Sequence, residues 1–251
     1  MALSHAGLSL LSMIFLGGSI VMMFFVILSG VAHTSPLGNT YFLSADTSGI
    51  TGARDVTQWT YFYHCGAGNL DCGKAAPAPA FGSAWSANPS NAPSALVGSS
   101  GGNTTSHYYY LMWRFGWVFW IMSLFFAVAA FFTGFVACCG RLGSAVAGFA
   151  TAIALLFFTV AVSLMTAVFV KARNAFIADG RTASVGRWAF GFAWGAWAAL
   201  FISLALYCIG TRAGKDKYTA GSGGSRWGRQ KSVRSRRSYD MGSRRVKDDY
   251  S

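Results

Sequence analysis

The chain has 251 residues, of which 53% are hydrophobic and only 11% are charged. Soluble domains usually carry about 25% charged residues, so this composition argues against a soluble globular protein and favours a membrane protein. The net charge of +12 is concentrated at the C-terminal end, where residues 211–251 hold twelve Lys and Arg against four Asp.

Four runs in the chain contain no charged residue and are long enough to cross a bilayer. They are Leu8–Val31, Phe115–Gly140, Leu142–Val170 and Trp188–Thr211. A span needs about 20 apolar residues, and its backbone polar groups must be satisfied internally, which favours helices. The buried core helix of a soluble protein is the alternative for one such run, but four in so short a chain argue against it. We therefore predict an all-α membrane protein with a four-helix transmembrane bundle.

The first run has two interpretations. Small residues precede Ala32, as at the cleavage site of a signal peptide. However, no Lys or Arg precedes the run, and it exceeds the apolar core of a signal peptide, which has about 7–15 residues. We expect it to be a retained span.

The basic C-terminal tail predicts the orientation of the bundle. Lys and Arg next to a span favour the cytoplasm, so both termini of a four-span chain should be cytoplasmic. The second outer loop opposes this rule with four basic residues, but the tail outweighs it. The predicted segments are the N-terminus and first span (1–32), an extracellular loop domain (33–112), the second span (113–140), a cytoplasmic turn and third span (141–170), a second extracellular loop (171–187), the fourth span (188–211) and a cytoplasmic basic tail (212–251).

The long loop reads as a small β-rich domain in its first half. Thr40–Leu43 and Asp55–His64 are rich in aromatic and β-branched residues and are separated by turn formers, which predicts short strands. Pro, Ala, Ser, Gly and Asn dominate Ala75–Thr105, so we expect an irregular or mobile stretch there.

Two cysteines of this loop, Cys65 and Cys72, are expected to form a disulfide because they lie on the oxidising side of the membrane. A bridge across so short a loop would contribute about 2–3 kcal/mol. A metal site is the alternative, but His64 is the nearest nitrogen ligand and no second pair of ligands follows. Nearby Trp59 either packs against the bridge, lies at the membrane surface, or is a core aromatic of the loop.

The motif made by Trp59, Cys65, the pair Gly68–Asn69, and Cys72, together with four spans, a short second loop and a basic tail, resembles the fungal Sur/PalI family. The resemblance covers residues 1–210. It implies a plasma-membrane tetraspan, distantly similar to claudins, with a left-handed bundle capped by a small sheet. It also implies a role in organising eisosome-associated furrows, with effects on endocytosis and cell-wall structure. Tyr61–Phe62–Tyr63 stands where claudins have Gly-Leu-Trp, so a tight-junction role is not expected.

Catalysis finds little support in the residue pattern. None of the four predicted membrane spans contains Asp, Lys, Arg or His in its interior. The four histidines of the chain are scattered near the membrane edges or in the long loop. We expect no enzyme activity, no cofactor and no metal. The leading function is a membrane-organising tetraspan of the plasma membrane in cortical patches. An accessory membrane sensor of the pH-signalling type is the alternative, and the uncharged spans disfavour a channel or small transporter.

Small residues in the spans predict close helix packing. Gly191, Gly195 and Ala199 share one face of the fourth span. They serve either contacts within the bundle or a homo-oligomer.

Several residues are candidates for modification. Cys138, Cys139 and Cys208 lie at the cytoplasmic ends of spans and are either palmitoylated or small apolar fillers. Asn103 begins a glycosylation sequon on the predicted outer side.

The tail composition predicts a disordered segment that contacts anionic inner-leaflet lipid, in particular phosphoinositides. Tethering at the membrane makes lipid a nearer polyanion than nucleic acid, so we expect no nucleic-acid partner; cortical scaffold proteins are possible partners. The alternative is a topology signal alone. The densest basic cluster is Arg226, Arg229, Lys231, Arg234, Arg236 and Arg237.

Overall fold

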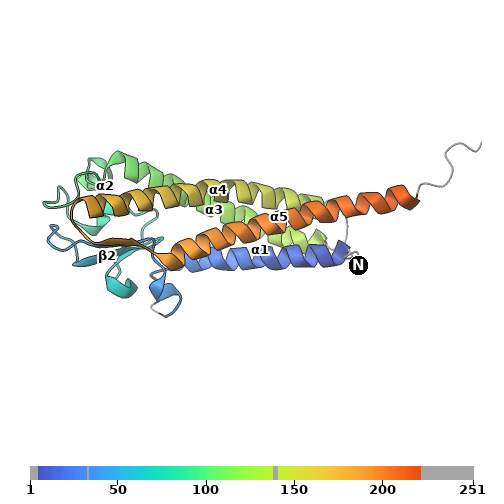
Figure 1. Ribbon diagram of the computed structural model, residues 1–251, viewed down its shortest axis with the longest axis horizontal. Coiled ribbons are helices and arrows are strands. Elements are labelled where there is room, and N and C mark those ends of the chain that lie inside the picture. Colours follow the sequence, from blue (N-terminus) through green and yellow to red (C-terminus); the bar gives the residue numbers. More distant parts are fainter. Residues whose placement is uncertain (1–4, 33, 138–140, 222–251) are drawn as a thin grey trace, which may run out of the picture. The chain divides into compact units, whose positions relative to one another are not determined.

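The computed structural model describes residues 5–32, 34–137 and 141–221. Its long helices are α1 (His5–Ile27), α3 (His107–Ala137), α4 (Arg141–Ala178) and α5 (Arg187–Gly221) (Figure 1). Each contains a segment long and apolar enough to cross a membrane, which confirms the predicted all-α membrane class with four spans. The chain divides into two compact units, Met1–Ala213 and Gly214–Ser251, and the features below belong to the first.

Small residues set the packing of the bundle. Along α4 the buried positions Ala147, Thr151, Ala154, Phe158 and Ala161 alternate in steps of four and three residues, the spacing of a helix that packs along one stripe. Large apolar residues lie on the opposite faces of the helices, as a lipid environment requires. Among these exposed side chains are Phe125, Phe132, Phe149, Leu156 and Phe201.

Serine side chains add polar contacts between the helices. The Ser12 hydroxyl donates to the Ser203 carbonyl at 2.8 Å, and the Ser203 hydroxyl donates to the Ser12 carbonyl at 3.0 Å, which joins α1 to α5. On the other side of the bundle, Ser123 of α3 donates to the Ala154 carbonyl of α4 at 2.8 Å. In lipid such a bond replaces an otherwise unsatisfied polar group. Figure 1 shows these two pairs, α1 beside α5 and α3 beside α4.

The helix ends differ from the predicted span limits. Helix α4 continues from the predicted limit at residue 170 to Ala178, and α3 begins at His107 instead of 113. Their outer turns can leave the apolar layer because the loops cover them: Phe169, Ala172 and Phe176 of α4 are fully buried. Helix α1 ends earlier than predicted, at Ile27, and α5 runs past 211 to Gly221, a stretch without proline.

Both connecting loops lie at the same end of the bundle and fold into one antiparallel sheet (Figure 1). Its strands are β1 (Leu43–Asp46), β2 (Val56–Trp59), β3 (His64–Cys65) and β4 (Ala183–Val185), in the order β3-β2-β1-β4. Strand β4 comes from the second loop and pairs with β1. We call residues 28–32, 34–106 and 179–186 together the loop domain.

The predicted β character of the long loop is confirmed, but the predicted first strand, Thr40–Leu43, is wrong in its limits. Residues Leu37–Asn39 form a 3-10 turn, η1, and Thr40 closes it. The Thr40 amide donates to the Leu37 carbonyl at 3.1 Å, and its hydroxyl donates to the Pro36 carbonyl at 2.8 Å. Because its amide and its hydroxyl both donate within this turn, Thr40 does not donate to a neighbouring strand.

The stretch Ala75–Thr105 is irregular, as predicted, with short helical turns at η3 (Phe81–Ala84) and α2 (Ser100–Asn103). It is nevertheless packed against the rest of the loop domain. Phe81, Trp85 and Leu96 are buried, and the Trp85 indole donates to the Thr104 carbonyl at 3.1 Å. A few large apolar anchors therefore hold a segment whose average composition is that of a loop.

Candidate functional site

The motif of the long loop forms a tight, cross-linked turn. Cys65 and Cys72 are joined by a disulfide. Between them lies η2 (Ala67–Asn69), in which Gly68 has φ 72° and Asn69 has φ 55°. Both values fall in the left-handed region that Gly and Asn tolerate best, so the Gly-Asn pair permits the chain to reverse inside the bridged loop.

Asn69 uses this turn to connect three separate segments. Its side chain is fully buried, and its amide nitrogen donates to the carbonyls of Leu37 and Thr40 at 3.0 and 2.9 Å. Its backbone N–H donates to Oε1 of Gln58 on β2 at 2.8 Å. The bridged loop is thus held against both η1 and the sheet. The sequence singled out Asn69 as a motif residue but gave no sign of these partners.

Trp59 is a core aromatic, one of the alternatives that the sequence left open. Its side chain is 1% exposed, and its indole donates to the Phe81 carbonyl at 3.2 Å. Its ring lies 5.9 Å from that of Phe81, 6.4 Å from that of Trp85 and 5.8 Å from that of Phe176 at the outer end of α4. Trp59 therefore ties the sheet to the irregular stretch and to the bundle at once.

Aromatic rings continue from Trp59 across the whole junction between the loop domain and the bundle. The Phe42 ring stacks on that of Phe169 with centroids 4.8 Å apart and meets Trp113 edge-on at 5.8 Å. The Tyr61 hydroxyl donates to the Trp117 carbonyl of α3 at 2.9 Å. Such pairs contribute about 0.5–1.5 kcal/mol each beyond area burial. We call this set the aromatic layer: Phe42, Trp59, Tyr61, Phe81, Trp113, Trp117, Trp120, Phe169 and Phe176.

Arg181 connects the second loop to the first. Its guanidinium donates to the carbonyls of Ser48 and Asn91, both at 2.7 Å, and pairs with the Asp179 carboxylate at 3.1 Å. The sequence pointed to Arg181 only as one of the basic residues that oppose the predicted orientation. In the structure its charge is used within the loop domain, which gives this residue a structural reason to be there.

His64 lies beside the disulfide in a partly buried position. Its Nδ1 is 3.3 Å from the Ser83 hydroxyl of the irregular stretch. Burial, and secondarily the charge of Arg54, lowers the pKa of the His64 imidazole below its usual value. The metal alternative loses its sulfur ligands because both cysteine thiols are in the disulfide. Within residues 5–32, 34–137 and 141–221, no three His, Cys, Asp or Glu side chains group to hold an ion.

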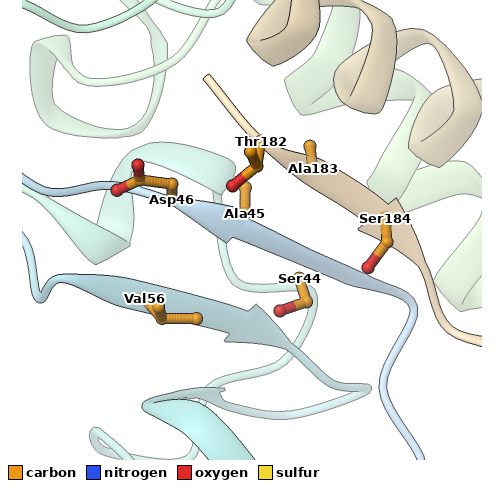
Figure 2. Close-up of a pocket in the computed structure, with 7 residues that line it drawn as sticks. All are labelled: Ser44, Ala45, Asp46, Val56, Thr182, Ala183 and Ser184. Atoms are coloured by element: carbon orange, nitrogen blue, oxygen red, sulfur yellow. The ribbon is translucent and has the colours of Figure 1, made fainter.

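The exposed face of the sheet carries a pocket with a volume of about 250 Å³. Figure 2 shows residues from β1, β2 and β4, with the neighbouring residue Thr182, around it. Three of its seven lining residues carry hydroxyls, three are apolar, and Asp46 adds a carboxylate. Sequence reasoning missed this pocket because its two main sides come from loops more than a hundred residues apart. The lining residues are Ser44, Ala45, Asp46, Val56, Thr182, Ala183 and Ser184.

The predicted helix-packing residues of α5 divide into two groups. A Cβ atom on Gly195 would lie 3.1 Å from the Met22 sulfur of α1, and Ala199 is 8% exposed, so both pack inside the bundle. Gly191 has no side-chain or backbone neighbour within 4 Å of its Cβ position in the described part of the chain. The shared spacing thus does not place all three in one contact.

The structure places two of the predicted modification sites. Cys208 lies on α5 and is exposed. Asn103 is exposed, while the sequon's Thr105 is buried and accepts a hydrogen bond from the Gly82 amide at 2.8 Å. Palmitoylation and glycosylation stay predictions. Cys138, Cys139 and the six basic tail residues from Arg226 to Arg237 lie outside the described residues.

With this geometry in view, sequence comparison decides the family. The SUR7/PalI family matches residues 8–206, which include both loops, the second and third spans and most of the first and fourth. The chain belongs to the SUR7/PalI family. The Sur/PalI resemblance carried by Trp59, the Gly-Asn pair and the two cysteines is thereby confirmed.

Three relatives in the SUR7/PalI family come from yeasts. Protein SUR7 of Candida albicans is 33% identical over 80% of this chain and 73% of its own length. The SUR7 family protein FMP45 of Saccharomyces cerevisiae is 36% identical over 74% of this chain and 60% of its own length. A further S. cerevisiae relative, named as a plasma membrane protein, is 32% identical over 73% of this chain and 62% of its own length. Together with the four apolar helices, these similarities make the chain a multi-pass plasma-membrane protein.

Proposed function

We propose that this SUR7/PalI protein is a non-enzymatic tetraspan that organises an eisosome-associated furrow domain of the plasma membrane and thereby influences endocytosis and cell-wall structure. It acts by self-association and lipid contact, without chemistry of its own. The role itself is inferred from the family, and the structure adds a physical reason why such a protein suits it.

The observation that carries the proposal is the continuity between the loop domain and the spans. The aromatic layer runs from Trp59 of the sheet to Phe169 and Phe176 of α4, and Arg181 closes the second loop onto the first. A protein built in this way transmits contacts made outside the bilayer to its helices with little hinge motion. That property is useful in a structural component of a membrane domain.

The lack of charged residues in the spans argues against a transporter. Transporters and proton relays usually place ionisable groups inside the bundle. No Asp, Glu, Lys, Arg or His occurs in the runs Leu8–Val31, Phe115–Gly140, Leu142–Val170 and Trp188–Thr211.

The proposed orientation has the loop domain outside and both termini in the cytoplasm. A disulfide persists in an oxidising compartment, and the basic tail favours the cytoplasmic face. Protease added to intact spheroplasts should therefore leave a C-terminal tag uncleaved. Cleavage of that tag without lysis would contradict the orientation.

The proposed partners are further copies of the chain, cortical scaffold proteins and anionic inner-leaflet lipids, including phosphoinositides. The lipid contact rests on the cluster Arg226–Arg237, where each basic residue near an anionic surface contributes about 1 kcal/mol. Replacing its six basic residues with Gln should leave membrane insertion intact and weaken binding of a tail peptide to anionic vesicles at physiological salt. Equal binding of both peptides would reduce the cluster to a topology signal.

Fluorescent tagging in the native cell tests the function. We expect static cortical patches from the full-length protein. Asn69→Gly, which loosens the loop domain, should disperse the patches, whereas the exposed control Asn88→Gly should not. A uniform plasma-membrane signal or an endosomal signal from the unaltered protein would overturn the proposal.

A further inference from the structure

The pocket on the sheet is lined by no residue of the aromatic layer. In β1 the buried side chains Leu43 and Ala45 alternate with Ser44 and Asp46, which share the exposed face. The antiparallel register places Ser184 opposite Ser44 and Val56 opposite Asp46. Thr182 lies beside Asp46, whose amide donates to the Thr182 carbonyl at 2.9 Å. The pocket is thus assembled by both loops (Figure 2).

The Asp46 carboxylate is held in place by Ser48. Its Oδ1 accepts hydrogen bonds from the Ser48 hydroxyl at 2.6 Å and from the Ser48 amide at 2.9 Å. These bonds, the hydroxyl bond first, lower the pKa of the carboxyl group, so it is ionised at neutral and mildly acidic pH. No group in the described part of the chain donates to Oδ2, which leaves a fixed, charged acceptor beside the pocket.

The hydroxyl groups around Asp46 also have unused hydrogen-bond donors and acceptors. Within the described residues, the side chains of Thr182 and Ser184 make no hydrogen bond. From the residues that the structure describes, the Ser44 hydroxyl accepts only the long, 3.5 Å contact from the Gln58 side-chain amide. The pocket therefore offers one charged acceptor and three hydroxyls, each able to donate and accept, next to the small apolar surface of Val56.

This lining argues against three ligand classes: anions, metal ions and drug-sized molecules. An anion would meet the Asp46 carboxylate without a basic residue among the lining side chains. A metal ion needs several ligands, and no group of three His, Cys, Asp or Glu occurs in the described ranges. The volume is below the roughly 300–1,000 Å³ of pockets that take drug-sized molecules. A small neutral molecule with several hydroxyl groups fits both the chemistry and the size.

We propose that this pocket binds one ring of a neutral saccharide. A ring hydroxyl donates to Oδ2 of Asp46, a charge-assisted bond stronger than one between neutral groups. The hydroxyls of Ser184 and Thr182 bond to neighbouring ring oxygens, and Val56 contacts the C–H face of the ring.

Binding is measured on purified full-length protein in nanodiscs, so the outcome does not depend on orientation, localisation or patch formation. The probes are neutral hexasaccharides of glucose and of mannose, with a hexamer of glucosamine as the cationic comparison. Saturation-transfer NMR titration should give saturable binding of at least one neutral probe, with a Kd of about 1 mM or tighter. Absence of saturable binding by the neutral probes, or binding of the cationic hexamer alone, would overturn the proposal.

Matched variants assign the binding to this pocket. Asp46→Asn keeps an oxygen for the Ser48 bonds but removes the charge, and should weaken binding about tenfold. Ser184→Ala should weaken it about threefold. Asp55→Asn changes an exposed carboxylate outside the pocket and should have no effect. Unchanged affinity in both pocket variants, with thermal unfolding like that of the unaltered protein, would place the binding elsewhere and refute the inference.

Discussion

The bundle and the loop domain of this SUR7/PalI protein are stabilised in different ways. In the bundle, small residues repeat at helical spacing and serine hydrogen bonds join neighbouring helices. The stabilisation of the bundle is therefore distributed over many similar positions. In the loop domain, a few residues far apart in sequence each hold several segments: Asn69 holds three, and Arg181 reaches two stretches of the first loop. Single substitutions should therefore be tolerated in the spans and be severe in the loops.

Gly186 gives the largest expected effect. A Cβ atom there would lie 1.6 Å from the Tyr41 carbonyl oxygen, at the point where the Gly186 amide donates to the Phe42 carbonyl at 3.0 Å. Because backbone must move, Gly186→Ala should destabilise the loop domain by about 3 kcal/mol or more. Thermal unfolding in nanodiscs, followed by tryptophan fluorescence, measures the loss.

Gly191 provides a matched control five residues further along the chain. Its Cβ position is open, so Gly191→Ala should be neutral or slightly stabilising, since Ala is the better helix former. If the two variants unfolded at the same temperature, the contrast between loop domain and bundle would fail at its clearest point.

Asn69 comes next. Asn69→Gly removes both side-chain donor bonds but tolerates the positive φ. We expect a loss of about 2–3 kcal/mol, because the buried Thr40 carbonyl loses its Asn69 donor and the Leu37 carbonyl keeps only the bond from the Thr40 amide. Asn88→Gly is the control because Asn88 also has positive φ but is exposed. Faster trypsin cleavage at Arg54 in the first variant alone is the expected result, and equal cleavage rates would contradict it.

Ser12 tests the bundle with a smaller expected effect. Polar contacts between helices in membranes average about 0.6 kcal/mol, so Ser12→Ala should lower stability by about that amount despite its buried pair with Ser203. Steric-trap or denaturant unfolding in bicelles measures the difference. A loss of stability as large as that caused by Asn69→Gly would mean that the bundle, too, depends on individual hydrogen bonds.

The smallest effect is a pH dependence from His64. Its folded-state pKa is lowered, so below the usual value of 6.5 the unfolded chain binds the proton first. The contribution of His64 is therefore fully present above pH 6.5, is lost as pH falls toward the lowered pKa, and is constant below that. His64→Gln should flatten the unfolding temperature between pH 7 and pH 5, and an identical slope in both proteins would contradict this assignment.

The sequence predicts the parts of the fold that depend on local pattern. The uncharged runs predict the four helices. The cysteine pair together with Trp59 predicts the disulfide-bridged loop and indicates the family. The sequence does not reveal β4, because Ala183–Val185 becomes a strand only by pairing with β1 from the other loop. The sequence also suggests that residues 75–105 are less well packed than they are, because their average composition does not reveal that Phe81 and Trp85 are buried.

The candidate pocket shows the same limit. Ser44, Asp46, Thr182 and Ser184 are ordinary polar loop residues in the sequence, and only the register between β1 and β4 brings them together. Arg181 was noted for its charge, whereas its function depends on three acceptors in different segments. Long-range pairing is thus the information that local patterns lack.

The central claim is that the two loops form one sheet closed by Arg181. Hydrogen exchange of the full-length protein in nanodiscs tests it most directly. Amides at Asp46 and Gly186, which bond to the Thr182 and Phe42 carbonyls, should be protected together. Arg181→Ala should speed their exchange about tenfold, while Arg173→Ala, which alters an exposed contact to Asn174, should leave them unchanged. Rapid exchange at Gly186 in the unaltered protein, with β1 and β2 still protected, would contradict the claim.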